Sequence, residues 1–179
     1  MSVARRQRTL ARPVSVTGFG YFSGRDIRVD FWPAAEHSGI TFVRHDIGAA
    51  ARVPASTLLR IDQPRRTTLE LNGIRVEMVE HVLAALAGLR VDNCDVWVDA
   101  AEMPGCDGSS LAFVEAIDSA GVVEQRSAVR QIVVGHTVRV GGHDSWIEAQ
   151  PPRSAGLSIS FELDYGEQSA IGRQLFALD

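Results

Sequence analysis

Glu80 and His81 are adjacent residues whose types could support hydrolytic chemistry. A histidine can hold a zinc ion, and a neighbouring carboxylate can take a proton from the water that the metal activates. The same pair would also fit a surface glutamate and a hydrogen-bonded histidine near the start of a helix. The two residues by themselves therefore leave both a metal site and a structural role open.

Residues 76–93 predict an amphipathic helix that carries this pair. Its apolar residues recur at intervals of three and four, which places them on one side of a helix: Val79, Val82, Leu83 and Leu86. Glu80 and His81 lie off this stripe. The rest of the outward face is expected to carry small residues in place of charged ones: Ala84, Ala85, Ala87 and Gly88. Small residues there indicate close approach by another element or by a ligand.

The composition is that of a globular protein, with 45% hydrophobic and 22% charged residues among 179. The net charge of −4 and the lack of a clustered basic face with aromatic residues argue against a nucleic-acid partner. Cys94 and Cys106 show neither a metal-site nor a disulfide spacing. We expect no signal peptide and no transmembrane segment, and hence a cytoplasmic protein.

Alternating apolar residues predict several strands around the helix. We expect a strand over residues 10–16, one through Ile27, Val29 and Phe31, and another over residues 40–44. A further strand follows the helix, with Cys94 and Val96 on its buried side. These segments predict a sheet against which the helix packs.

Two turn signals complete the predicted unit. Asn72-Gly73 separates two short apolar runs and predicts a type I′ hairpin turn, because both residues tolerate a positive φ. D-G-S-S at residues 107–110 offers capping side chains to a second helix that ends near Gly121. We expect Leu111, Val114 and Ile117 of that helix to point inward. Together these elements predict an α+β fold, a two-layer arrangement with two helices on one face of a mostly antiparallel sheet.

The strand pattern restarts near residue 132 and resembles the beginning of the chain. D-x-x-V-x-F-x-P at residues 26–33 has a counterpart, D-x-x-I-x-A-x-P, at residues 144–151. An internal repeat of this kind implies two similar domains. We therefore expect a first α+β domain over residues 1–127, and over residues 128–179 the opening strands of a second, similar and incomplete domain.

Four motifs resemble those of the zinc-dependent UDP-3-O-acyl-N-acetylglucosamine deacetylase family, which acts in bacterial lipid A biosynthesis. They are Q-R-T-L at residues 7–10, V-E-H-x-x-x-A-L-A-G-L-x-x-D-N at 79–93, E-x-P-x-x-D-G-S at 102–109, and I-G-R-Q at 171–174. The resemblance implies two similar α+β domains with the active site between their helix layers. It favours a metal site over a structural role for the Glu-His pair.

The resemblance also implies a role for each residue of the pair. His81 matches a Zn²⁺ ligand, and Glu80 matches the general base that takes a proton from the zinc-bound water. The family's other ligands lie in an H-x-x-x-D helix of the second domain, where a later catalytic His also belongs, and no H-x-x-x-D occurs in this sequence. Catalytic zinc usually takes three protein ligands, so we expect these 179 residues alone to be inactive.

Two functions remain open at this point. The chain could be the N-terminal part of a zinc amidohydrolase that removes acetate from UDP-3-O-acyl-N-acetylglucosamine. Its site would then be completed by the missing part of the second domain or by a complementing chain. The alternative is a truncated, non-catalytic homologue that acts as a binding or interaction module.

Several positions depart from the family's usual pattern. Phe22 stands where a His is usual, in the glycine turn of residues 20–24, and removes a polar group from near the site. Met78 stands where a Thr is usual, which would lose a helix N-cap. Gly105 and Cys106 replace larger apolar residues. These changes leave the family assignment intact and put full activity in question.

Other polar residues are expected to be solvated. Arg65 and Arg66 could contact a phosphate of a UDP-sugar, but a solvated pair is the expected arrangement. His136 and His143 flank a Gly-Gly turn and are expected to be exposed hairpin residues, not metal ligands.

Overall fold

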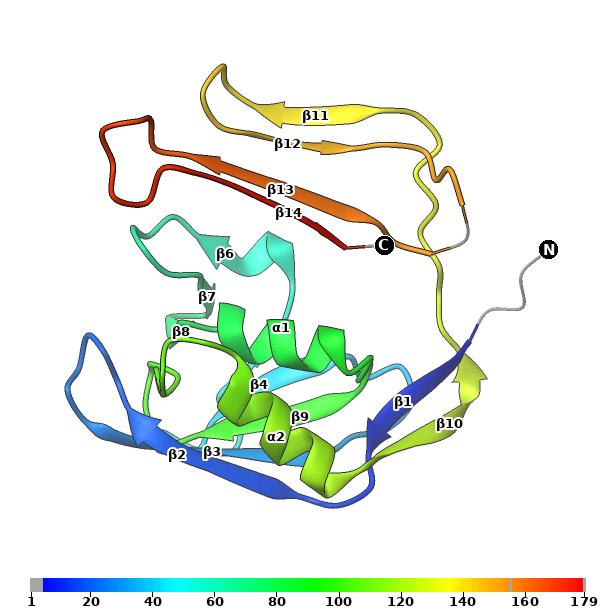
Figure 1. Cartoon of the computed structure of the whole chain (residues 1–179). Helices are drawn as coiled ribbons and strands as arrows, with labels where there is room; N and C mark the ends of the chain where they lie inside the picture. The colour runs from blue at the N-terminus through cyan, green and yellow to red at the C-terminus, as the bar shows by residue number, and fades with distance from the viewer. Residues whose placement is uncertain (1–4, 155, 179) are drawn as a thin grey trace. The chain divides into compact units, whose positions relative to one another are not determined.

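The computed structural model describes residues 5–154 and 156–178, and the chain divides into two compact units (Figure 1). The first unit is Met1–Arg130 and the second is Gln131–Asp179. The boundary expected between residues 127 and 128 lies at the end of β10 (Val122–Ala128). No helix in the described part of the chain is long and apolar enough to cross a membrane.

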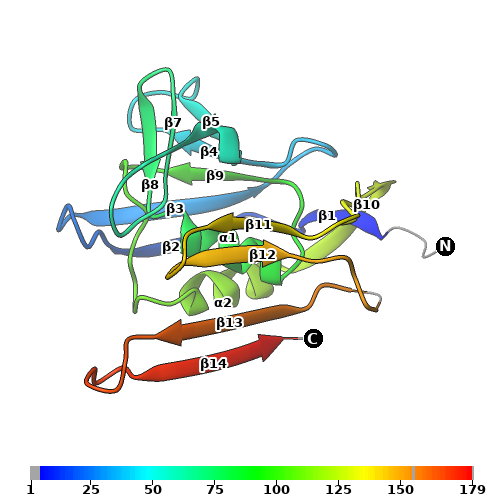
Figure 2. The same ribbon diagram turned by 90° about the horizontal axis from the view of Figure 1, so that it is seen from above.

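A five-stranded sheet forms one layer of the first unit. Its strand order is β2 (Val14–Phe19), β3 (Asp26–Pro33), β9 (Cys94–Val98), β4 (Ile40–Arg44) and β5 (Arg52–Pro54). Neighbouring strands are antiparallel except β4 and β9, which are parallel. Seen from above, β2, β3, β9 and β4 lie side by side (Figure 2). The predicted alternation is confirmed, since Ile27, Val29 and Phe31 are buried and Arg28 is exposed.

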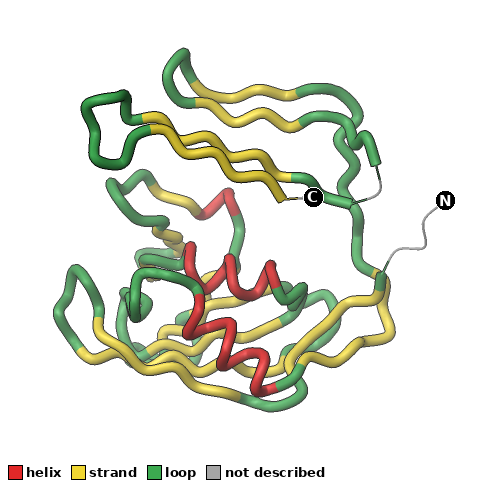
Figure 3. Tube along the Cα trace, viewed as in Figure 1, coloured by secondary structure: helices red, strands yellow, loops and turns green. Residues whose placement is uncertain are grey.

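Two helices, α1 (Glu80–Gly88) and α2 (Leu111–Ala120), cover one face of this sheet (Figures 1 and 3). Phe31 of β3 meets Phe113 of α2 edge to face, with ring centroids 6.1 Å apart, and both side chains are fully buried. Such an aromatic pair adds about 1 kcal/mol to the hydrophobic burial of the two rings. The predicted α+β fold with two helices on one face is confirmed.

The buried stripe of α2 differs from the predicted one. Phe113, Ile117 and Ala120 are buried, whereas Leu111 is 54% exposed. The buried residues are four and three positions apart and so share one side of the helix, and Leu111 falls outside that side. The expected end is confirmed, because Gly121 has a left-handed φ of +76° and donates its N–H to Asp118.

A small three-stranded sheet leads the chain into α1. It consists of β6 (Arg60–Ile61), β7 (Thr68–Leu71) and β8 (Ile74–Glu77), and it follows a short 3₁₀ turn, η1 (Thr57–Leu59). Asn72 and Gly73 have φ values of +52° and +79°, as a type I′ turn requires, so the predicted hairpin is confirmed. Because β8 ends just before α1 begins, this hairpin determines where Glu80 and His81 emerge.

The strand expected over residues 10–16 is wrong, because the chain breaks there into two strands. β1 is Arg6–Leu10 and pairs with β10, whereas β2 begins only at Val14. Pro13 lies in the break, has no N–H to donate to a ladder and fixes its own φ. The Ala11 N–H bonds to the Gly121 carbonyl oxygen at 2.8 Å, so the chain turns from one sheet into the other at this point.

A buried polar network joins β1 to the segment that follows α1. Asn93 Nδ2 donates to Gln7 Oε1 at 2.9 Å and to Gln125 Oε1 at 2.7 Å. Asn93 Oδ1 accepts from the Gly39 N–H at 2.9 Å, and Thr9 Oγ1 donates to the Asn93 carbonyl at 2.8 Å. The Q-R-T-L motif and the D-N end of the V-E-H motif thus contact each other. Their role in this unit is structural.

Replacement of Asn93 with alanine is expected to destabilise the first unit by about 2–4 kcal/mol, because it leaves several buried polar groups without partners. The midpoint of urea unfolding measures this loss. The matched control is Asp62→Ala, whose side chain is 95% exposed and whose effect is expected to stay within about 0.5 kcal/mol. Equal midpoints for the two variants would contradict the structural role of Asn93.

The second unit consists of two antiparallel hairpins. One pairs β11 (Val138–Gly141) with β12 (Trp146–Ala149), and the other pairs β13 (Ile159–Asp164) with β14 (Arg173–Leu178). His136 and His143 are exposed, as predicted. That these strands begin a second domain similar to the first stays a prediction.

Candidate active site

The chain enters α1 through a left-handed residue. Met78 has a φ of +57° and its side chain is buried, with 4% exposed. Val79 occupies the N-cap position, in the α region and without a side-chain cap hydrogen bond. The start of α1 thus has no side-chain cap, but the N-cap position is Val79 and not Met78. Met78 belongs to the core beneath the start of α1.

The outward face of α1 is largely as predicted. Val79, Val82 and Leu86 are buried. Ala84, Ala87 and Gly88 are exposed, which confirms the small-residue face. Ala85 was expected on that face but is buried, because it follows Val82 by three positions and so lies on the same side of the helix.

The Glu80 carboxylate is held by the backbone of another element. Its Oε2 accepts a hydrogen bond from the Thr67 N–H, at the entrance to β7, at 3.0 Å. The side chain is half-buried. Within residues 5–154, no donor bonds to its other oxygen, Oε1. Glu80 is therefore oriented by the fold, with one oxygen left for another partner.

The D-G-S stretch carries a carboxylate, Asp107, on which the charge of His81 acts. The pKa of Asp107 lies below its usual value, chiefly because Ser109 donates its N–H and its hydroxyl to Asp107 Oδ1 at 2.9 and 2.8 Å. Burial opposes this shift, and the positive charge that His81 can carry adds to it. The charge of His81 therefore reaches a motif that is separated from it along the chain.

Glu102, in the E-x-P part of the third motif, organises the glycine turn. Its two carboxylate oxygens accept the Phe22 and Ser23 N–H groups at 2.9 and 2.8 Å. Burial raises the pKa of Glu102, but these hydrogen bonds and the nearby charge of Arg66 outweigh it, and the pKa lies below its usual value. A Cβ on Gly20 would lie 2.4 Å from Glu102 Oε2, so only glycine leaves room for this carboxylate.

Arg66 does not form a solvated pair with Arg65, so that expectation is wrong. Arg65 is exposed, but the Arg66 side chain is only 15% exposed and its Nε lies 3.3 Å from Glu77 Oε2. Its guanidinium carbon lies 4.1 Å from the centroid of the Phe22 ring. A cation therefore stacks on the Phe22 ring.

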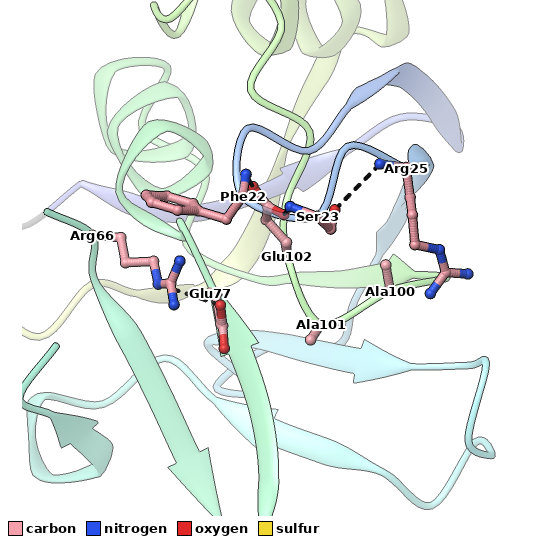
Figure 4. A pocket seen from close by; sticks show the side chains of 8 residues that line it. All are labelled: Phe22, Ser23, Arg25, Arg66, Glu77, Ala100, Ala101 and Glu102. Carbon is pink, nitrogen blue, oxygen red and sulfur yellow. Dashed lines mark hydrogen bonds and ion pairs between the residues drawn. The ribbon is translucent and has the colours of Figure 1, made fainter. Parts of the chain in front are cut away.

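These side chains surround a hollow of about 270 Å³ near the start of α1 (Figure 4). It is lined by the following residues: Phe22, Ser23, Arg25, Arg66, Glu77, Ala100, Ala101 and Glu102. Sequence reasoning assigned no function to Thr67, Glu102 or Arg66. The E-x-P spacing could have pointed to Glu102, but nothing local marks the Thr67 N–H or the burial of Arg66.

The described residues hold no complete set of metal ligands. In residues 5–154 and 156–178, no three His, Cys, Asp or Glu side chains gather closely enough to hold a metal ion. His81 is half-buried, stands next to an oriented carboxylate and is suited to be one zinc ligand. The chemistry of His81 fits a single ligand of a zinc site.

Comparison with known proteins decides the family. The model of the UDP-3-O-acyl N-acetylglycosamine deacetylase family matches residues 7–179. The chain belongs to this family. The resemblance inferred from the four motifs is confirmed, and the family match runs through both units of the structure.

Curated relatives in this family carry the name UDP-3-O-acyl-N-acetylglucosamine deacetylase. The Shewanella denitrificans protein is 39% identical over 160 residues, which is 89% of this chain and 52% of the relative. The Psychrobacter arcticus protein is 40% identical over 159 residues, covering 89% and 49% of the two chains. The Anaeromyxobacter sp. protein is 42% identical over 159 residues, covering 89% and 51%. The chain spans about half the length of these relatives.

Proposed function

We propose that this chain is the N-terminal part of a zinc-dependent deacetylase that removes acetate from UDP-3-O-acyl-N-acetylglucosamine in lipid A biosynthesis, in the cytoplasm. The observation that carries the proposal is the Glu80–His81 pair at the start of α1, with Glu80 oriented by the Thr67 N–H. Membership of the deacetylase family and the names of the relatives support the reaction and the substrate.

His81 would hold the zinc ion together with ligands that the described residues do not supply. When bound, zinc would lower the pKa of a water molecule and polarise the acetamide carbonyl of the substrate. Glu80 would accept the proton of the attacking water at Oε1, the oxygen that Thr67 leaves free. The Thr67 N–H would keep the carboxylate from rotating away during this transfer.

The other ligands would come from the rest of a second domain, which residues 131–179 begin, or from a complementing chain. The small residues on the outward face of α1 support this arrangement, because Ala84, Ala87 and Gly88 allow close approach by another element. The 179 residues alone are accordingly expected to bind zinc weakly and to release no acetate.

Removal of zinc from the complete gene product is expected to lower acetate release from UDP-3-O-acyl-N-acetylglucosamine by at least about 100-fold, because both the water and the carbonyl lose their activating ion. Dialysis against a chelator followed by an acetate assay measures this change. One equivalent of Zn²⁺ should restore the rate, and Mg²⁺ should not. Full turnover after complete removal of the metal would contradict the proposal.

A further inference from the structure

Arg66 is held on several sides within the first unit (Figure 4). Its guanidinium stacks on the Phe22 ring at 4.1 Å, and its Nε pairs with Glu77 Oε2 at 3.3 Å. Glu102 lines the same hollow as Arg66, and the charge of Arg66 helps to lower the pKa of its carboxylate. Glu102 in turn accepts the Phe22 N–H, so the ring beneath Arg66 is itself fixed by a neighbour of Arg66.

The ion pair alone does not explain this placement. Arg66 Nε is buried and is not aligned for a hydrogen bond with any described residue. A buried N–H group without a hydrogen bond costs free energy. If the ion pair served only to stabilise the fold, the Arg66 Nε–H would be expected to point at the Glu77 carboxylate and form a hydrogen bond with it. Stacking and charge hold the Arg66 side chain here.

The backbone that follows Arg66 leads directly to Glu80. The next residue is Thr67, whose N–H donates to Glu80 Oε2 at 3.0 Å. The Thr67 carbonyl oxygen accepts the Val79 N–H at 3.4 Å, so the same residue contacts the start of α1 twice. The Thr67 N–H belongs to the peptide group that joins Arg66 to Thr67. Immobilising Arg66 therefore restrains the orientation of this N–H.

We propose that Arg66, clamped between Phe22 and Glu77, is a positioning residue that holds the Thr67 N–H against the Glu80 carboxylate. This inference rests on the proposed function, in which Glu80 is the base. A base displaced by a fraction of an ångström transfers a proton less well, although substrate binding is unchanged. Loss of the clamp should therefore lower kcat and leave KM nearly constant.

The first test is a set of kinetic measurements on the complete gene product, per folded and zinc-loaded molecule. Arg66→Gln is expected to lower kcat about tenfold with KM within about twofold, and Arg66→Lys, which keeps the charge beside Glu77, to recover part of the loss. Arg65→Gln is the matched control, because Arg65 is exposed, and it should leave kcat unchanged. A kcat of Arg66→Gln equal to that of wild type would overturn the proposal.

A double-mutant cycle then tests whether Arg66 acts through Glu80. In a Glu80→Gln background the tenfold effect of Arg66→Gln should largely vanish, because the group being positioned is already disabled. An unchanged tenfold effect would assign Arg66 a role independent of Glu80 and would refute the proposal. High activity of Glu80→Gln itself would instead refute the proposed function.

Amide hydrogen exchange of Thr67 gives a readout that needs no activity. The Thr67 amide should exchange at least about tenfold faster in Arg66→Gln than in wild type, and at the wild-type rate in Arg65→Gln. A purely structural role would speed exchange across the whole unit to a similar degree. Unchanged protection of Thr67 in Arg66→Gln would overturn the inference even if Glu80 proved to be the base.

Discussion

The Glu80→Gln variant of the complete gene product is expected to release acetate about 10²–10⁴ times more slowly than wild type, while its zinc content stays the same. A glutamine has the shape of the glutamate and its amide oxygen can still accept the Thr67 N–H. It cannot accept a proton from water. The chemical step should therefore fail although the fold and the metal site persist.

Initial rates at saturating substrate, together with zinc analysis of the same sample, measure both quantities. Glu115→Gln is the matched control, because Glu115 is an exposed glutamate on the neighbouring helix α2. It should keep the wild-type rate. A Glu80→Gln variant that turns over normally would remove Glu80 from the role of base.

The His81→Ala variant is expected to lose zinc, with an affinity for the metal at least about 100-fold below that of wild type. Removal of a residue that only hydrogen-bonds to a metal ligand already lowers metal affinity by about 10- to 100-fold, and the loss of a ligand itself should cost more. Competition with a zinc chelator measures the affinity. His143→Ala should bind zinc normally, because that side chain is fully exposed in the second unit. Equal affinity in His81→Ala and wild type would exclude His81 as a ligand.

The parts of the fold that depend on local pattern were predictable from the sequence. Asn72-Gly73 requires positive φ values, and the intervals among Val79, Val82 and Leu86 suit one helix face, so neither inference needs a distant contact. The break between β1 and β2 was also marked locally, by Pro13, but the apolar residues on either side of it hid the signal.

The parts that depend on distant contacts were not predictable. Arg66 looks solvated beside Arg65, but the fold brings Phe22 and Glu77 to it, and its side chain is only 15% exposed. The Thr67 N–H is a backbone group, and no side-chain pattern marks it. The parallel pairing of β4 with β9 likewise joins strands about fifty residues apart. Sequence pattern located the Glu-His pair, and the structure added the groups that orient it.

The most direct test of the central claim is an anomalous difference map of the complete gene product, crystallised with zinc and measured at the zinc absorption edge. The proposal predicts a single strong peak about 2.0–2.1 Å from a ring nitrogen of His81, with the Glu80 carboxylate beside it and not among the ligands. A zinc peak remote from His81, with none at His81, would contradict the assignment of the Glu80–His81 pair to the metal site.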